Sequence, residues 1–510
     1  MKKTFFTLGC LTLLALIVRL FLIQYYQCID TDGVSYVSIA KELFEKHRLL
    51  DRFYPPLYPF LLGLTSYMFN NYELAGRFVS AVLGALLVIP TYFLGKEIYG
   101  KKTGVIASIF VIIHPSLTDY SARVLTESTS TFFLTLFLLV SIHAIKSSKW
   151  WLYVISGFLI GIAYLTRPEA LGFLPYFIGA SITIVLFGKA GDPKNLIKNL
   201  VFFLLASMTL MLPYMIFVGG LSGKTGLHLV VAESVGEENF PRAVDIQITK
   251  YNPAESPSFF NELLRNPYKM AKRWVINLHL THKFVIPGLF PPLLLIAIGF
   301  GIFRMKFRFT QWKELYIAFS WIPYLFVLFL IIVGARFLLP LIPVSLILGA
   351  RGIEIVEDRL YKRVMKIKNL PIKQTVHHLI FAAVLLSLLP YTFRPLYRPD
   401  DNAIYRDAGI WIKENIPPPI KIIDRKSWVA FYSNAELIPL PIGEYDEVIQ
   451  YAYKKDADYL IIDNRVIPEV RPELTFLLSK YFVPHELKLV REFKNKNGQI
   501  VLLYQILRDK

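Results

Sequence analysis

The sequence predicts a mainly helical protein that crosses a membrane about eleven times and ends in a small α/β domain. Of the 510 residues, 54% are hydrophobic and only 18% are charged, whereas about 25% of the residues of a soluble domain are charged. Apolar runs close to the ~20 residues that cross a bilayer recur along most of the chain. We therefore expect a transmembrane domain over residues 1–393 and an extracytoplasmic α/β domain over residues 394–510.

The apolar runs give the positions of the expected membrane spans. A lysine pair before the first run is typical of a signal peptide, but Arg19 interrupts that run and no small-residue cleavage site follows it. We therefore expect a retained first span. The expected spans cover residues 4–23, 74–94, 103–117, 128–145, 151–165, 171–186, 200–218, 284–302, 315–333, 337–350 and 376–391.

Lysine and arginine are concentrated in alternate loops, which predicts the orientation of the chain. With a cytoplasmic N-terminus, the basic loops all face the cytoplasm, as the positive-inside rule requires. The opposite side then receives the loops 24–73 and 219–283 and the C-terminal domain. This topology accounts for the net charge of +18, so we expect membrane lipid and no nucleic acid as a partner. A multi-pass protein of the plasma membrane is the expected outcome.

The C-terminal part of the chain has a different composition. Residues 421–423 and 459–462 are expected to form strands, and residues 447–454 and 472–480 are expected to form helices. A hairpin turn over residues 494–498 is expected before a strand at 500–503. The chain shows no internal repeat, which disfavours a transporter because transporters are commonly built from repeated halves.

The first outer loop holds the most informative residues. It reads DTDGVSY over residues 30–36, followed by an amphipathic stretch and then by YPPLY over residues 54–58. Asp32 comes shortly after the first span, where a carboxylate can stay ionised at the water boundary while lipid-borne groups reach it. The two adjacent prolines block a helix and fix a bend.

These residues resemble those of GT-C glycosyltransferases of the protein-mannosyltransferase, aminoarabinose-transferase and RgtA-like group. In that group an Asp lies in the first outer loop, an aromatic residue follows a few positions later, and a Pro-Pro-Leu-Tyr-like element lies downstream. Asp32, Tyr36 and the element at 55–58 match this pattern, whereas Gly33 stands where Glu is common. The role of a second carboxylate is therefore either absent or taken over by Asp30, which could equally be a solvated loop residue. The resemblance covers about residues 1–343.

The resemblance implies transfer of a sugar, with inversion, from a polyprenyl- or dolichyl-phosphate donor to a hydroxyl or amine at the outer face. The acceptor would be a glycan, a lipid or a protein. Such an acceptor needs a general base, and Asp32 is the candidate. The departing phosphate needs cations, for which the arginine fork is suited. The candidates for binding donor phosphate or substrate are Arg123, Arg167, Arg336, Asp30, Glu127, Tyr36 and Tyr58.

Several of these candidates also have a structural interpretation. Asp32 could cap a helix, and Glu127 could pair with Arg123 four residues earlier. Arg167 could extend to the membrane interface. Two cysteines, Cys10 and Cys28, are too few for a cysteine-based metal site, so no metal ligands are assigned. Some members of the resembled group bind a divalent ion, which leaves a metal ion as an open possibility.

Two other functions remain open at this stage. The first is a transporter or flippase of a lipid-linked or anionic solute, which predicts charged sites near the middle of the bilayer. The candidate residues of this chain gather at one surface, which favours the enzyme. The second is a scaffold without catalytic activity whose C-terminal domain binds a partner.

Overall fold

The computed structural model describes residues 2–48, 51–188, 190–234, 239–250, 264–305, 308–331, 333–364, 378–398, 400–479 and 481–508. The chain divides into two compact units. The first unit, Met1–Ile23, Ile39–Lys224 and Tyr268–Tyr397, holds the apolar helices. The second unit, Gln24–Ser38, Thr225–Pro267 and Arg398–Lys510, holds the β-sheet.

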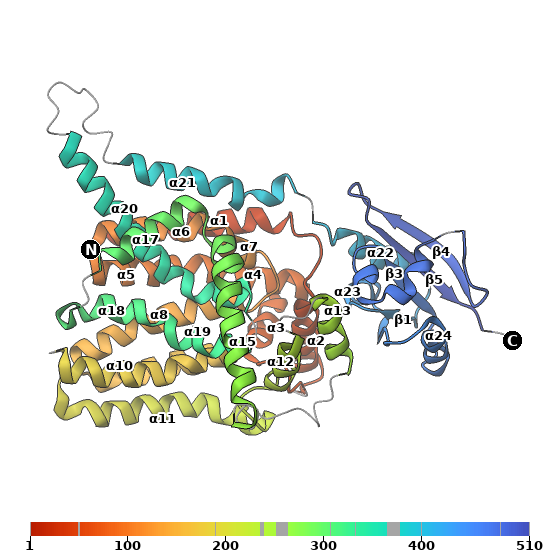
Figure 1. Cartoon of the computed structure of the whole chain (residues 1–510), viewed down its shortest axis with the longest axis horizontal. Helices are drawn as coiled ribbons and strands as arrows, with labels where there is room; N and C mark the ends of the chain where they lie inside the picture. The colour runs from red at the N-terminus through yellow and green to blue at the C-terminus, as the bar shows by residue number, and fades with distance from the viewer. Residues whose placement is uncertain are drawn as a thin grey trace. The chain divides into compact units, whose positions relative to one another are not determined.

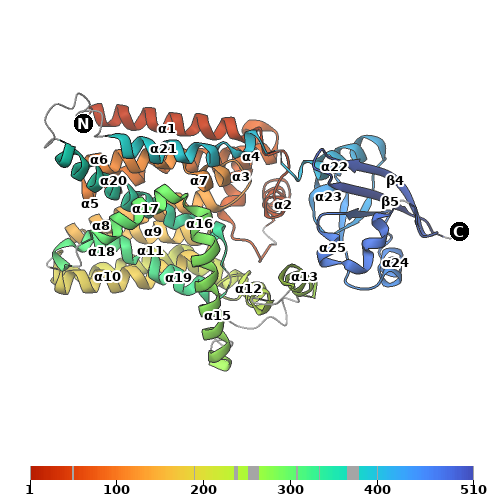
Figure 2. The same cartoon turned by 45° about the horizontal axis from the view of Figure 1, so that its top comes forward.

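The first unit contains helices that can cross a membrane. Over the residues described, seven helices are long and apolar enough for this, and nine are obtained when two bent pairs are each counted as one span. Two shorter apolar helices, Leu57–Phe69 and Trp150–Tyr164, accompany them. The long helices run side by side, and α15 (Pro267–Leu280) crosses their direction (Figures 1 and 2). The chain is a multi-pass membrane protein.

Each apolar run predicted as a span matches one helix or two helices separated by a short break, and residues 330, 331 and 333, at the end of the run 315–333, are not helical. Residue 332, near the end of the expected span 315–333, and residues 376 and 377, at the start of the last expected span, lie outside the described residues. In chain order, the matching helices are α1 (Lys2–Ile23), α4 (Tyr72–Leu86) with α5 (Val88–Tyr99), α6 (Lys101–Ile113) with α7 (Pro115–Ser121), α8 (Glu127–Ser147), α9 (Trp150–Tyr164), α10 (Phe173–Phe187), α11 (Pro193–Val218), α16 (Ile286–Leu289) with α17 (Pro292–Phe303), α18 (Trp312–Phe319) with α19 (Trp321–Phe329), η6 (Ala335–Leu341) with α20 (Ile342–Val364), and α21 (Leu379–Thr392).

Several of these runs are broken at proline. The helices before and after Pro291 are bent by 114°, so residues 284–302 do not form one straight span. A break of 53° separates α6 from α7 before Pro115. Proline lacks the N–H that continues the helical hydrogen-bond ladder, so the carbonyl four residues earlier needs another donor. Val111 O receives this bond from Arg19 Nη2 of α1 at 3.0 Å, which ties the break to the first span.

Close packing of α9 on α11 follows from two glycines one turn apart. A methyl group at Gly157 would lie 2.8 Å from Ala206 Cβ, and one at Gly161 would lie 3.0 Å from Leu210 Cβ. Membrane helices commonly use this spacing of small residues to bring backbones together. The sequence G-x-x-x-G therefore fixes this contact.

Short helices occupy the first expected outer loop and part of the second. In the first loop, α2 (Thr31–Glu45) precedes α3 (Leu57–Phe69), which begins directly after the predicted proline bend. Asn71 caps α4 by accepting a hydrogen bond from Leu74 N at 3.0 Å, as N-cap residues do. The second loop contains α12 (Thr225–Val231) and α13 (Phe240–Lys250).

The sheet of the second unit has five strands: β1 (Lys421–Asp424), β2 (Glu436–Pro439), β3 (Tyr459–Asp463), β4 (Leu487–Lys494) and β5 (Ile500–Ile506). Their order is β2-β1-β3-β5-β4. β1 is parallel to β2 and β3, whereas β5 is antiparallel to β3 and β4. The predicted strands and the hairpin turn are confirmed.

Successive residues of the central strands face opposite sides of the sheet. Ile422 and Ile461 pack with α22 (Ala403–Asn415) and α23 (Trp428–Ser433), whereas Ile423 and Ile462 pack with α24 (Tyr445–Lys454). Helices therefore cover both faces, which explains why these strands are continuously apolar. The predicted helix over residues 472–480 is a 3-10 helix, Pro472–Leu478; its last predicted residue lies outside the described ranges.

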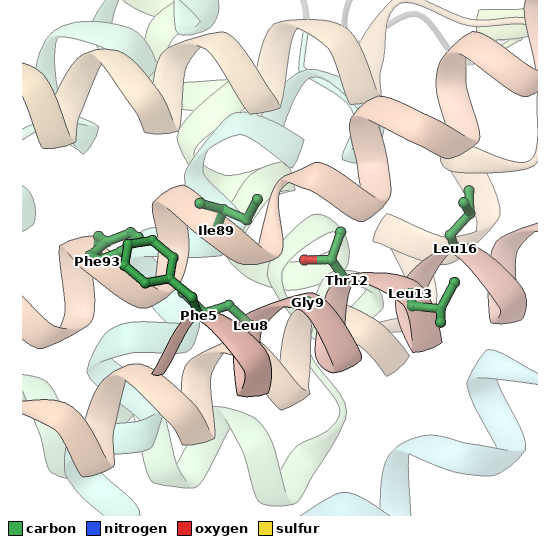
Figure 3. Close-up of a pocket in the computed structure, with 8 residues that line it drawn as sticks. All are labelled: Phe5, Leu8, Gly9, Thr12, Leu13, Leu16, Ile89 and Phe93. Carbon is green, nitrogen blue, oxygen red and sulfur yellow. The ribbon is translucent and has the colours of Figure 1, made fainter. Parts of the chain in front are cut away.

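A groove of about 470 Å³ lies between α1 and α5 (Figure 3). Its lining is apolar except for the hydroxyl of Thr12 and comprises Phe5, Leu8, Gly9, Thr12, Leu13, Leu16, Ile89 and Phe93. Such a lining suits lipid chains and offers no acid or base for catalysis.

Candidate functional site

The carboxylate of Glu127 lies inside the first unit and binds two arginines. Glu127 is the first residue of α8 and is fully buried. Its Oε1 atom accepts a hydrogen bond from Arg167 Nη1 at 2.7 Å and from Arg336 Nε at 2.7 Å. The sequence predicted these three residues separately, and the fold brings them together. The position of Glu127 at the N-terminus of α8 also favours the charged form of its carboxylate.

The two arginines differ in accessibility. The side chain of Arg167 is 7% exposed, and that of Arg336 is 33% exposed. Arg167 also pairs with Glu169 at 3.1 Å, so two carboxylates hold it. Phe337 lies against both guanidinium groups, with its ring centre 5.2 Å and 5.9 Å from their Cζ atoms. Arg336 is thus the arginine of this cluster that a ligand can reach.

Two further predicted residues of the first unit have their own contacts. Arg123 Nη2 pairs with Asp119 Oδ1 at 3.0 Å, whereas the sequence had suggested Glu127 as its ion-pair partner. Tyr58 is fully buried, and its hydroxyl lies 3.0 Å from Gly76 O and 2.9 Å from Ser80 Oγ. Tyr58 therefore packs α3 on α4, and its expected part in substrate binding stays a prediction.

The predicted base belongs to the second unit. Asp32 lies in the first turn of α2 and is half-buried. The helix begins with a hydrogen bond of 3.0 Å from Val34 N to Asp30 O, and Tyr36 is buried one turn beyond Asp32. The positive end of the helix dipole stabilises an ionised carboxylate in this position. Asp32 is the second residue of α2 and not the residue before the helix, so the expected helix cap is not what the structure shows. Its part as the base stays a prediction.

Other charged residues of the second unit surround Lys426, between β1 and α23. Burial lowers the pKa of Lys426, the charge of Arg425 lowers it further, and Asp245 and Asp32 oppose this effect. Asp245, on α13, pairs with Arg425 at 2.9 Å and with Arg471. A cation therefore lies close enough to the predicted base to interact with it.

Two carboxyl groups end neighbouring parallel strands of the sheet. Burial raises the pKa of Asp424 to about 8, and it also raises the pKa of Asp463. The negative charge of Asp463 is a smaller cause of this raised pKa of Asp424. Asp424 is thus largely protonated at neutral pH. In the described part of the chain, no group of three or more His, Cys, Asp or Glu residues is placed to hold a metal ion.

Sequence reasoning missed Lys426, Asp245, Asp400 and Tyr432. Asp245 pairs with a residue 180 positions away, and Asp400 accepts hydrogen bonds from backbone groups 372 and 373 positions away. No local motif marks such residues, because their partners become neighbours only in the folded chain. The proline-rich segment before Asp400 predicts a turn and nothing more.

Comparison with known proteins finds a family model and several solved structures that are similar to this chain. The family model described as dolichyl-phosphate-mannose-protein mannosyltransferase matches residues 54–217. The oligosaccharyltransferase of Archaeoglobus fulgidus tethered with an acceptor peptide is 14% identical, with a TM-score of 0.63 over 98% of this chain and 74% of that one. No curated protein matches the chain by sequence.

Two ligand-bound structures are similar as well. The oligosaccharyltransferase AglB of A. fulgidus, in complex with an inhibitory peptide and a dolichol-phosphate, is 16% identical, with a TM-score of 0.61 over 90% of this chain and 70% of that one. ArnT from Cupriavidus metallidurans, bound to undecaprenyl phosphate, is 14% identical, with a TM-score of 0.54 over 97% of each chain.

These matches show that the chain has the fold of the GT-C superfamily of membrane glycosyltransferases. The match to the protein-mannosyltransferase family model covers residues 54–217 of this fold. The resemblance predicted from the first outer loop is confirmed.

Proposed function

We propose that the chain is an inverting glycosyltransferase that moves a sugar from a lipid-phosphate carrier to an acceptor at the outer face of the plasma membrane. The observation that carries this proposal is Asp32 in the first turn of α2, on a GT-C fold. In this proposal the N-terminus is cytoplasmic and the C-terminal domain is extracytoplasmic, in agreement with the distribution of lysine and arginine.

In the proposed reaction, Asp32 accepts the proton of the acceptor hydroxyl or amine. The acceptor atom then attacks the anomeric carbon while the bond from that carbon to the phosphate oxygen breaks. The electron pair of this bond leaves with the lipid phosphate, so a single displacement inverts the anomeric centre. A positioned base of this kind contributes roughly 10²–10⁴ in rate. Asp30, which directly precedes α2, and Tyr36, on α2, are proposed to contact the substrate.

The leaving phosphate gains negative charge, which arginine can stabilise by two parallel hydrogen bonds. Arg336 is proposed for this role because it is one-third exposed, whereas Arg167 is buried between two carboxylates. Arg123 is a second candidate because its side chain is 31% exposed. The similar structures with dolichol-phosphate and undecaprenyl phosphate support a polyprenyl-type carrier.

The test uses the purified full-length chain in detergent, a panel of radiolabelled polyprenyl-phosphate sugars, and cell-envelope extract as the acceptor. We expect the wild type to transfer label from at least one donor and Asp32→Asn to lose about a hundredfold or more in rate. Donor binding should be retained in that variant. The matched control is Glu42→Gln, because Glu42 lies on the same helix and forms an exposed pair with Lys46.

Transfer that is equally fast in Asp32→Asn and the wild type would exclude Asp32 as the base. A wild type that transfers no sugar from any donor, and that moves labelled lipid across proteoliposomes equally well with and without the substitution, would contradict the proposed enzyme. That result would support the flippase.

A further inference from the structure

The backbone just before α2 is bound by side chains of the C-terminal domain. Asp400 Oδ2 accepts hydrogen bonds from Gln27 N and from Cys28 N, both at 2.9 Å. The hydroxyl of Tyr432 accepts a hydrogen bond from Ile29 N at 2.9 Å. Three consecutive backbone N–H groups are thus bound by two side chains from the other end of the chain, and all of these residues belong to the second unit.

The bound segment has little freedom to move. Cys28 and Ile29 are buried, and α2 starts two residues after Ile29. A helix moves as a rigid element, so a shift of the backbone at Ile29 is passed on to the first turn of α2. Asp32 lies in that turn. The placement of its carboxylate therefore depends on these hydrogen bonds.

The two side chains are themselves fixed by the C-terminal domain. Asp400 Oδ1 accepts a hydrogen bond from Asn402 N at 2.9 Å, so both carboxylate oxygens are engaged. Tyr432 lies on α23, which packs on α22 at Gly409. A methyl group at Gly409 would lie 2.6 Å from Tyr432 Cβ, which shows how closely the two helices approach. Both helices pack on one face of the sheet.

We propose that Asp400 and Tyr432 are positioning residues, which hold the backbone of residues 27–29 so that Asp32 is placed for proton transfer. This inference rests on the proposed function. It gives the C-terminal domain a direct part in catalysis, in addition to any part in acceptor binding. The geometric demand is strict, because a misplacement of about 1 Å can cost a hundredfold in rate.

Lys426 provides an electrostatic link in the same region. It lies two residues before α23, and its titration is influenced by the charge of Asp32. The segment from β1 through α23 thus supplies both Tyr432, which binds the backbone before α2, and Lys426, a cation near Asp32. If the domain only held the backbone in place, the hydrogen bonds of Asp400 and Tyr432 would be sufficient, and no cation would be needed near Asp32.

The test measures kcat and KM for a radiolabelled undecaprenyl-phosphate hexose with Asp400→Ala, Asp400→Asn and Tyr432→Phe in the full-length chain. We expect kcat to fall about thirtyfold or more in Asp400→Ala, with KM within threefold. The loss should be smaller in Asp400→Asn, which keeps one acceptor oxygen. The matched controls are Asp401→Ala, whose carboxylate bonds Asn497, and Tyr453→Phe, whose hydroxyl bonds Leu507 O. Both should keep the wild-type kcat.

A second readout does not depend on activity. In a Cys10→Ser background, Cys28 is the one remaining cysteine, and its burial should make it react slowly with maleimide. We expect Asp400→Ala to raise the labelling rate of Cys28 at least tenfold and Asp401→Ala to leave it unchanged. Faster labelling together with the fall in kcat would support the inference.

Two results would overturn it. An unchanged labelling rate in Asp400→Ala would show that the carboxylate does not hold the segment. Faster labelling with an unchanged kcat would show that the segment is held but that Asp32 does not depend on it. The failure of the proposed function looks different, because the wild type itself would then transfer no sugar from any donor.

Discussion

Glu127→Ala should lower the free energy of unfolding of the membrane unit by about 3–5 kcal/mol. Glu127 is fully buried, and its removal leaves the charge of Arg167, which is only 7% exposed, with one carboxylate in place of two. The loss comes mainly from that buried charge, which Glu169 alone compensates only in part. Arg336 adds less to the loss, because its side chain is 33% exposed and water can solvate it.

Equilibrium unfolding in mixed micelles, driven by a rising mole fraction of SDS, gives the required free energies. The matched control is Glu42→Ala, which breaks an exposed pair with Lys46 and should cost less than about 1 kcal/mol. The double variant Glu127→Ala/Arg167→Met removes both buried charges. Its loss should be smaller than the sum of the two single losses by about 2 kcal/mol, because the residues are in direct contact.

Additivity of the two single substitutions to within about 0.5 kcal/mol would refute the reasoning. It would mean that Glu127 and Arg167 are not coupled, and that the cluster is held by packing around Phe337. A loss in Glu127→Ala no larger than that of the exposed control would lead to the same conclusion.

Three other predictions follow. Stability of the sheet domain should fall as pH rises from about 4 to about 8, because Asp424 is protonated in the folded chain up to about pH 8 and has an ordinary pKa of about 3.9 when unfolded. Asp424→Asn should make this slope clearly smaller but not zero, because burial also raises the pKa of Asp463. Hydrogen exchange of β1, corrected for the intrinsic rate, measures the slope; an equal slope in both proteins would contradict the assignment. Gly157→Ala should lower the melting temperature and Gly179→Ala should not, because an added methyl group meets Ala206 only in the first case; equal melting temperatures would argue against the close helix contact. Arg336→Lys should lose nearly as much kcat/KM for the lipid-phosphate donor as Arg336→Met, roughly a hundredfold, whereas activity retained in the lysine variant would show that charge alone is needed.

The positions of the helices were predictable because each crossing requires a long apolar run, which is a local property of the sequence. The same holds for the sheet domain, where the short apolar runs at Ile422–Ile423 and Leu460–Ile462 become central strands. The edge strand β2 was missed because Glu436–Pro439 is short and alternates little in hydrophobicity.

Breaks in the helices were harder to predict. Pro323 removes the donor for the carbonyl of Phe319, where α18 ends, and the run continues as α19. Pro213 lies inside α11 without ending it. The same residue type thus gives different outcomes, because neighbouring helices decide whether a freed carbonyl finds another donor.

The candidate site was predictable as single residues but not as contacts. A charged residue beside or within an apolar run can be identified as a candidate from the sequence alone, because charges near the membrane are costly unless paired. The pairing of Glu127 with Arg167 and Arg336 depends on three segments that lie far apart in the sequence. The contacts of Asp400 and Tyr432 depend on two ends of the chain.

Charge balance decides how the cluster around Glu127 could bind phosphate. Arg167 and Arg336 are matched by the carboxylates of Glu127 and Glu169, so the formal charges of the four side chains cancel. A phosphate would then gain little from the net potential of this cluster, and affinity must come from the directed hydrogen bonds of the guanidinium group. Lysine presents a point charge without that planar fork. Retained activity in Arg336→Lys would therefore contradict the geometry of the site as well as the choice of residue.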